Sequence, residues 1–215
     1  DISTDLHVWN KEKVFYCLFG RPTASRLGLA SFCYNKHKQN SLIHFSYSTS
    51  DNDKIHFEID KLFAYDTNAI INVGSFLEKL PLTISHTKNY TAFDGYDYND
   101  RLTTFYKDIL IDIVVESHVS GNTFFPTEKI FRPMLLKKPF IAFASKNFLC
   151  YLRQMGFRTF HDFWNEDYDG YEGKDRYKKI CKLIDQISKK SKEDLEKMYW
   201  DMTYSLDHNY NLLQD

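Results

Sequence analysis

Short apolar segments alternate with amphipathic segments along most of the chain. Residues 14–19 form an apolar, aromatic run that ends at a Gly-Arg-Pro turn, and residues 24–34 carry apolar side chains near helical spacing. The run predicts a buried strand and the spacing predicts a helix, with Thr23 or Ser25 as its cap. In residues 41–48 apolar and polar side chains alternate, which predicts a second strand.

The pattern is clearest in the second half of the chain. Residues 109–116 form a nearly continuous β-branched run, typical of an interior parallel strand, and residues 139–144 form another apolar run. A helix is predicted between them over residues 127–136, and a further helix over residues 147–155, with Gly156 as its stop. This order of strand, helix, strand and helix predicts a parallel sheet with both faces covered.

The middle of the chain, residues 51–106, has the weakest pattern. We expect a short helix near residues 55–63, a helix or strand near residues 69–80 and polar aromatic loops around residues 94–99. Two helices are expected to close the chain, over residues 174–190 and 192–210, with Ser191 as the cap of the second.

These elements predict an α/β protein with a Rossmann-like parallel sheet, flanking helices and a C-terminal helical segment. We expect residues 1–106 to form an N-terminal α/β lobe and residues 107–215 to form a second α/β lobe that carries the C-terminal helices. Parallel sheets bind ligands at the carboxyl ends of their strands. The segments that directly follow strands are therefore the expected location of a site.

Composition and charge narrow the classes of function. The chain has 215 residues, of which 43% are hydrophobic, so it can bury a substantial core. Its formal net charge of -1 creates no global field toward nucleic acid or an anionic membrane, so any anion site is expected to be local. No apolar run approaches the roughly 20 residues of a membrane helix. We expect a cytoplasmic protein with neither nucleic acid nor a membrane as its partner.

Cysteine and histidine spacing give no positive sign of a metal site. The four cysteines show no CxxC spacing, and the eight histidines show no HxxxH or HExxH spacing. We expect reduced, buried thiols and no bound metal.

The turn after the first predicted strand is the first candidate site. It contains Arg21 and Arg26 together with two hydroxyl residues. Arginine forks suit phosphate oxygens, and a helix N-terminus adds unpaired N–H donors. The turn has neither the Walker order nor the GxGxxG order. An equally weighted alternative is a solvated loop whose arginines pair with nearby acids.

The start of the helix predicted over residues 127–136 is the second candidate. Pro126 suits the first helical turn, and Thr127 and Glu128 follow where the helix dipole favours oxygen and negative charge. Glu128 can accept hydrogen bonds from ribose hydroxyls, while Lys129 or Arg132 can offset diphosphate charge. Because Glu128 and Arg132 are four residues apart, they share a helix face, and chemistry alone slightly favours a surface ion pair between them.

Two further segments carry candidate chemistry. Glu116 and His118 directly follow the β-branched run, where a carboxylate or imidazole can act as a general base, although a lone histidine is more often structural. Residues 164–169 combine a tryptophan with acids, in the manner of a carbohydrate platform or a cation site. A packed tryptophan with solvated carboxylates is the favoured alternative for this loop.

Four segments of the chain carry a resemblance to known proteins. They are KVFYCLFGRPTASRLGLA, LPLTI, IDIVVESH and the long stretch FFPTEKIFRPMLLKKPFIAFASKNFLCYLRQMGFRTFHDFWNEDYD. Together they resemble a family of uncharacterised glycosyltransferase-like proteins that is common in large DNA phages and viruses. Similar sequences carry an arginine-rich turn, a V-T-E-T strand end, a T-E-K-T-x-K-P helix start and an LGFKTF…W-W-D-E-S-Y-D pattern.

The T-E-K segment also resembles the nucleotide-sugar half of GT-B glycosyltransferases, in particular the fucosyltransferase-like enzymes. The resemblance spans residues 13–169 and implies donor-site roles for specific positions: Glu128 and Lys129 in donor binding, Thr127 at the helix start, and Arg21 or Arg26 in diphosphate contact. The chain departs from the family in a less dense basic turn, and Val115 replaces the polar residue that precedes the strand-end glutamate.

A complete GT-B enzyme has two Rossmann-like lobes with the site between them, and 215 residues is short for that plan. Three explanations remain open. The N-terminal part supplies a reduced lobe, the chain is a domain of a longer protein, or catalysis has been lost.

The leading hypothesis is a glycosyltransferase that passes a sugar from a nucleotide-sugar substrate to a hydroxyl of a glycan or another acceptor, without a cofactor. The expected roles are ribose binding by Glu128, phosphate neutralisation by Lys129, Arg132, Arg21 and Arg26, and general-base catalysis by Glu116 or His118. The alternative is a non-catalytic structural or binding module, virion-associated in a viral setting, that keeps the fold. Sugar transfer onto a nucleobase is disfavoured by the lack of a basic surface. For a viral protein the expected location is the host cytoplasm.

Overall fold

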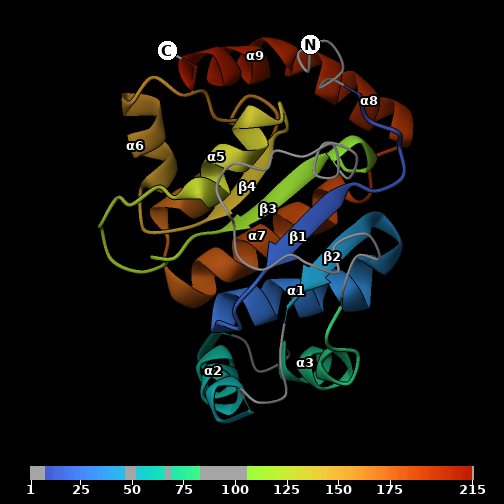
Figure 1. Ribbon diagram of the computed structural model, residues 1–215, viewed down its shortest axis with the longest axis vertical. Coiled ribbons are helices and arrows are strands. Elements are labelled where there is room, and N and C mark those ends of the chain that lie inside the picture. Colours follow the sequence, from blue (N-terminus) through green and yellow to red (C-terminus); the bar gives the residue numbers. More distant parts are fainter. Residues whose placement is uncertain (1–7, 47–51, 66–68, 83–105, 215) are drawn as a thin grey trace.

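The computed structural model describes residues 8–46, 52–65, 69–82 and 106–214, and it contains one sheet of four parallel strands (Figure 1). The strand order is β2-β1-β3-β4. The strands are β1 (Phe15–Phe19), β2 (Ser41–Phe45), β3 (Ile111–Val115) and β4 (Phe140–Phe143). The predicted α/β class with a Rossmann-like parallel sheet is confirmed.

Successive strands are added on one side of β1 and then on the other. β1 pairs with β2 on one side and with β3 on the other, and β3 then pairs with β4. The chain therefore leaves the adjacent strands β1 and β3 toward opposite edges of the sheet. In open α/β sheets, ligands bind outside the carboxyl ends of strands at such a switch point.

Helices cover both faces of the sheet (Figure 1). α1 (Ala24–His37) and α7 (Gly173–Ile187) pack together on one face, where the Tyr177 hydroxyl donates to the Gly28 carbonyl at 3.2 Å. α5 (Glu128–Leu135) and α9 (Thr203–Leu212) pack together on the other face. β1 contributes to both cores, because Phe15, Cys17 and Phe19 join the larger cluster while Tyr16 joins a smaller one with Tyr106 and Leu136.

The remaining helical elements lie around the sheet and the four helices that cover it. They are the 3₁₀ segments η2 (Lys38–Asn40) and η4 (Asp167–Gly170), and the helices α2 (Asn52–Tyr65), α3 (Ala69–Leu77), α6 (Phe148–Gln154) and α8 (Lys192–Asp201). α2 and α3 lie beside α1 at one end of the molecule (Figure 1).

Most expected elements are confirmed, and two expectations about helices change. The ambiguous segment near residues 69–80 is a helix, α3. The single helix expected over residues 192–210 is two helices, α8 and α9, which meet at Met202. Ser191 caps α8 as expected, since its hydroxyl accepts from the Asp194 N–H at 3.0 Å. The loops expected around residues 94–99 lie outside the described residues.

The two expected lobes share one sheet. β1 belongs to residues 1–106 and β3 to residues 107–215, and the two strands pair directly. A boundary at residue 106 therefore falls between strands of one described sheet and does not separate two sheets.

The acidic loop around Trp164 has a structural role that the favoured interpretation missed. Trp164 is packed in the core as expected, but Glu166 and Asp169 are buried as well. The Asp169 carboxylate accepts from the N–H groups of Leu149 and Cys150, so it caps α6 from a distant part of the chain. The expectation of solvated carboxylates is wrong for these two acids.

Candidate functional site

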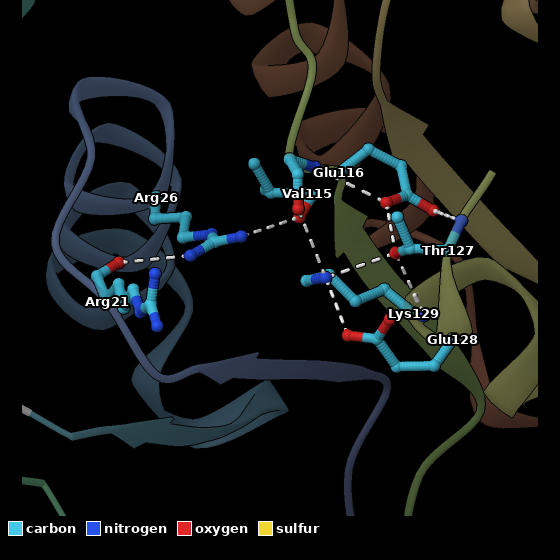
Figure 2. A network of polar contacts seen from close by, with 8 residues as sticks. Arg21, Arg26, Val115, Glu116, Thr127, Glu128 and Lys129 are labelled. Carbon is cyan, nitrogen blue, oxygen red and sulfur yellow. Dashed lines mark hydrogen bonds and ion pairs between the residues drawn. The ribbon is translucent and has the colours of Figure 1, made fainter. Parts of the chain in front are cut away.

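The candidate residues converge at the carboxyl ends of β1 and β3 (Figure 2). Arg21 and Arg26 follow β1, Glu116 follows β3, and the first turn of α5 approaches from the side of β4. Because β1 and β3 are adjacent, these segments meet at the switch point of the sheet.

α5 begins at Thr127, which is its N-cap. The backbone of Thr127 is extended, and its hydroxyl accepts from the Lys129 N–H at 3.4 Å. Glu128 is the first helical residue, where the dipole favours a negative charge. Pro126, which we expected in the first helical turn, precedes the cap and lies outside the helix.

Glu116 holds the start of α5 against the end of β3. Glu116 is only 2% exposed, and its carboxylate accepts hydrogen bonds from the Thr127 N–H at 3.1 Å and from the Thr127 hydroxyl. The Ser117 N–H donates to it as well, at 3.3 Å. Both carboxylate oxygens are therefore engaged in positioning the helix, which does not suit the general-base role expected for this residue.

Lys129 ties the helix start to the strand end. Its ammonium donates to the Thr127 hydroxyl at 3.1 Å, to the Ser117 hydroxyl at 3.4 Å and to the Glu128 carboxylate at 2.7 Å (Figure 2). Partial burial raises the pKa of Glu128, but the hydrogen bond and charge of Lys129 outweigh this and lower it overall. The half-exposed Glu128 side chain is therefore ionised at neutral pH.

Arg26 brings a buried cation to the same place from α1. Its guanidinium donates to the carbonyls of Arg21 and Val115, each at 3.3 Å, and the residue is 7% exposed. Burial lowers the pKa of Arg26, and the charges of Glu116 and Glu128 oppose that change. Figure 2 shows Arg26 on one side of Val115 and the pair of Lys129 and Glu128 on the other. Arg21 is exposed beside them.

Arg132 is not part of this region. Its guanidinium donates to both oxygens of the Asp112 carboxylate and to the Tyr106 hydroxyl, and its side chain is 4% exposed. The expected ion pair with Glu128 does not form, since Glu128 pairs with Lys129. The assignment of Arg132 to phosphate binding is therefore corrected. Its partner Asp112 is the one acid in an otherwise apolar strand, which is the signal that the sequence offered.

The N-terminus of α1 is closed by an acid that sequence reasoning missed. The Glu58 carboxylate, from α2, accepts from the Ala24 N–H at 2.7 Å. Thr23 caps the same turn by accepting from the Arg26 N–H at 3.4 Å. An anion near this turn is therefore expected to meet the arginine side chains, because the first backbone donor of α1 is occupied.

His118 and Phe125 form an exposed pair beside the site. Their rings meet edge to face with centroids 5.3 Å apart. Phe125 is 52% exposed, and the His118 side chain is exposed too. His118 is thus an accessible imidazole two residues after Glu116, whereas Glu116 is buried.

The described residues contain no group of three or more His, Cys, Asp or Glu side chains arranged to hold a metal ion. None of the helices described is both long enough and apolar enough to cross a membrane.

Comparison of the chain with protein-family models, curated proteins and solved structures gives no match. The functional assignment therefore depends on the chemistry of the site residues. A carboxylate at the first residue of a helix can bind vicinal hydroxyls, and the cations Lys129, Arg26 and Arg21 can bind phosphate oxygens. The arrangement suits a ligand that carries both groups.

Proposed function

We propose that this protein is a glycosyltransferase that binds a nucleotide-sugar at the carboxyl ends of β1 and β3. The observation that carries the proposal is the convergence of an ionised Glu128 with the cations Lys129 and Arg26 at the switch point of a parallel sheet. The resemblance to glycosyltransferase-like proteins of phages and viruses supports the same assignment. We place the protein in the cytoplasm, which for a viral protein is that of the host.

The donor would lie across the carboxyl ends of β3 and β1, from α5 toward α1. Glu128 would accept hydrogen bonds from the ribose hydroxyls, and Thr127 would hold the helix start. Lys129, Arg26 and the exposed Arg21 would contact the diphosphate. Ligand binding would separate Lys129 from some of its present acceptors, which are the side-chain oxygens of Ser117, Thr127 and Glu128.

The reaction would form a bond between the anomeric carbon and an acceptor hydroxyl of a glycan or another molecule. The bond from the anomeric carbon to the diphosphate oxygen breaks, and the nucleoside diphosphate leaves with that electron pair. Lys129, Arg26 and Arg21 offset the charge that develops on the leaving group. The accessible His118 takes the hydroxyl proton as general base. The nucleotide-sugar is the substrate, and the proposal includes no further cofactor.

Calorimetric titration with UDP-, GDP- and dTDP-sugars tests the donor site. We expect one of them to bind to the wild type and Glu128→Ala to weaken that binding at least tenfold, since two ribose hydroxyls lose a charged acceptor. Asp201→Ala is the matched control, because Asp201 and Glu128 are both half exposed and both pair with a lysine. Absence of binding to every donor, or equal affinity of the two variants, would contradict the proposal.

A non-catalytic binding module is the second candidate, and one observation favours it. Glu116, one of the two expected bases, is buried and fully engaged with Thr127 and Ser117. Such a module would retain the donor without turnover. A coupled assay for nucleoside diphosphate release separates the two functions. Binding without release, with the chain recovered in assembled virus particles, would support the module.

A further inference from the structure

Two buried carboxylates point from β3 toward α5. Asp112 and Glu116 are four residues apart, so they lie on the same face of the strand and its continuation. Asp112 is 0% exposed and Glu116 is 2% exposed. Glu116 binds Thr127 at the start of α5, and Asp112 binds Arg132 in its second turn. The strand and its continuation therefore contact the helix through two buried carboxylates.

Asp112 forms a hydrogen-bonded cluster with Arg132 and Tyr106, and the Tyr16 ring packs against it. Arg132 donates through Nη2 to both Asp112 oxygens, at 2.9 and 3.2 Å, and through Nε to the same carboxylate at 3.2 Å. The Tyr106 hydroxyl donates to Asp112 and accepts from Arg132 Nε. Burial disfavours the charge on Arg132, but the Asp112 carboxylate outweighs burial and raises the pKa of Arg132 above its ordinary value. Arg132 therefore carries its charge.

α5 needs such contacts to have a defined orientation. It has eight residues and contains Pro133, and a helix of about two turns is marginal without tertiary contacts. Glu128 and Lys129 lie about one turn before Arg132. A rotation or slide of the helix against β3 would move both side chains away from Arg26.

We propose that Asp112 and Arg132 are positioning residues of the donor site, which fix α5 so that Glu128 and Lys129 face the carboxyl end of β3. This inference rests on the proposed nucleotide-sugar site. Stability alone gives a poor reason for the pair, because a buried ion pair is often replaceable by apolar residues without loss of stability. Its fork of directional hydrogen bonds instead specifies one orientation of the helix.

The test compares Asp112→Asn with the double variant Asp112→Leu/Arg132→Met. The double variant removes both charges, so it is expected to fold even if the single variant does not. We expect each folded variant to bind the nucleotide-sugar at least about tenfold more weakly than the wild type, because small displacements of binding groups are costly. Hydrogen exchange should speed up at the amides of residues 127–135 while β3 and β4 stay protected.

Asp169→Asn is the matched control, since it alters a buried, hydrogen-bonded carboxylate that caps α6 and not α5. It should leave donor affinity and exchange in α5 unchanged. Wild-type affinity in the double variant would overturn the inference, as would an equal loss of affinity in the Asp169 variant. If the wild type binds no donor, the proposed function fails, and exchange in α5 still decides whether Asp112 fixes the helix.

Discussion

At the scale of single residues, Lys138 is a buried base with a strongly lowered pKa. It is 1% exposed, donates to the Val8 carbonyl at 2.8 Å and lies over the ring of Tyr199. Burial lowers its pKa to about 7, and the charge of Asp108 only partly opposes this. The lysine therefore loses its proton in the folded protein far below the pH at which it does so in the unfolded chain.

This shift predicts a pH-dependent stability. Between about pH 7 and the ordinary lysine pKa of about 10.4, the unfolded chain binds a proton that the folded protein lacks, so this group favours folding more as pH rises. Lys138→Met removes that dependence. In urea unfolding from pH 6.5 to 9, we expect the variant's gain in stability over the wild type to be largest at pH 6.5 and to shrink steadily. A constant difference across that range would refute the assignment.

His118 accepts the proton of the acceptor hydroxyl in the proposed reaction. Removing the imidazole in His118→Ala should slow sugar transfer by about 10²- to 10⁴-fold, the usual contribution of a general base. Donor affinity should stay within about twofold, because His118 makes no proposed donor contact. Single-turnover assays with calorimetry separate the two effects. An unchanged transfer rate would show that another group accepts the proton.

At the scale of helices, the caps divide into local and remote ones. Thr23, Thr127 and Ser191 each cap the helix that follows directly. Sequence spacing predicted Ser191 as a cap and Thr23 as one of two candidates, while Thr127 was expected at the helix start and not as its cap. Glu58 and Asp169 instead supply acceptors to helices from distant parts of the chain. Sequence patterns report local spacing and contain no information on which distant acid reaches a helix end. These two acids were therefore not predictable as caps.

The remote cap of α6 gives a test at this scale. Asp169→Ala leaves the N–H groups of Leu149 and Cys150 without their acceptor, and the first of these groups is buried. We expect a loss of about 1–3 kcal/mol in the free energy of unfolding, the range for unsatisfied buried donors. Equilibrium denaturation measures it. The exposed neighbour Asp167→Ala, which removes only an ion pair with Lys179, should cost less than about 1 kcal/mol.

At the scale of the whole molecule, apolar runs predicted the strands, but they could not predict their order. Pairing of β1 with β3 joins residues almost a hundred positions apart, and it merges the two expected lobes into one sheet. The rule for strand ends brought the segments after β1 and β3 to the same end of the sheet, because it needs only the strand direction. Arg132 was misassigned because its partner lies inside β3, and a helix pattern cannot show which strand residue a helix faces.

The central claim is that Glu128, Lys129 and Arg26 form one nucleotide-sugar site across β1 and β3. A crystal structure after soaking with the donor that binds most tightly in calorimetry tests it most directly. We expect density for a ribose within hydrogen-bond distance of Glu128 and for a diphosphate that contacts Lys129 and Arg26. Donor density bound elsewhere on the molecule, with these three side chains unchanged, would contradict it.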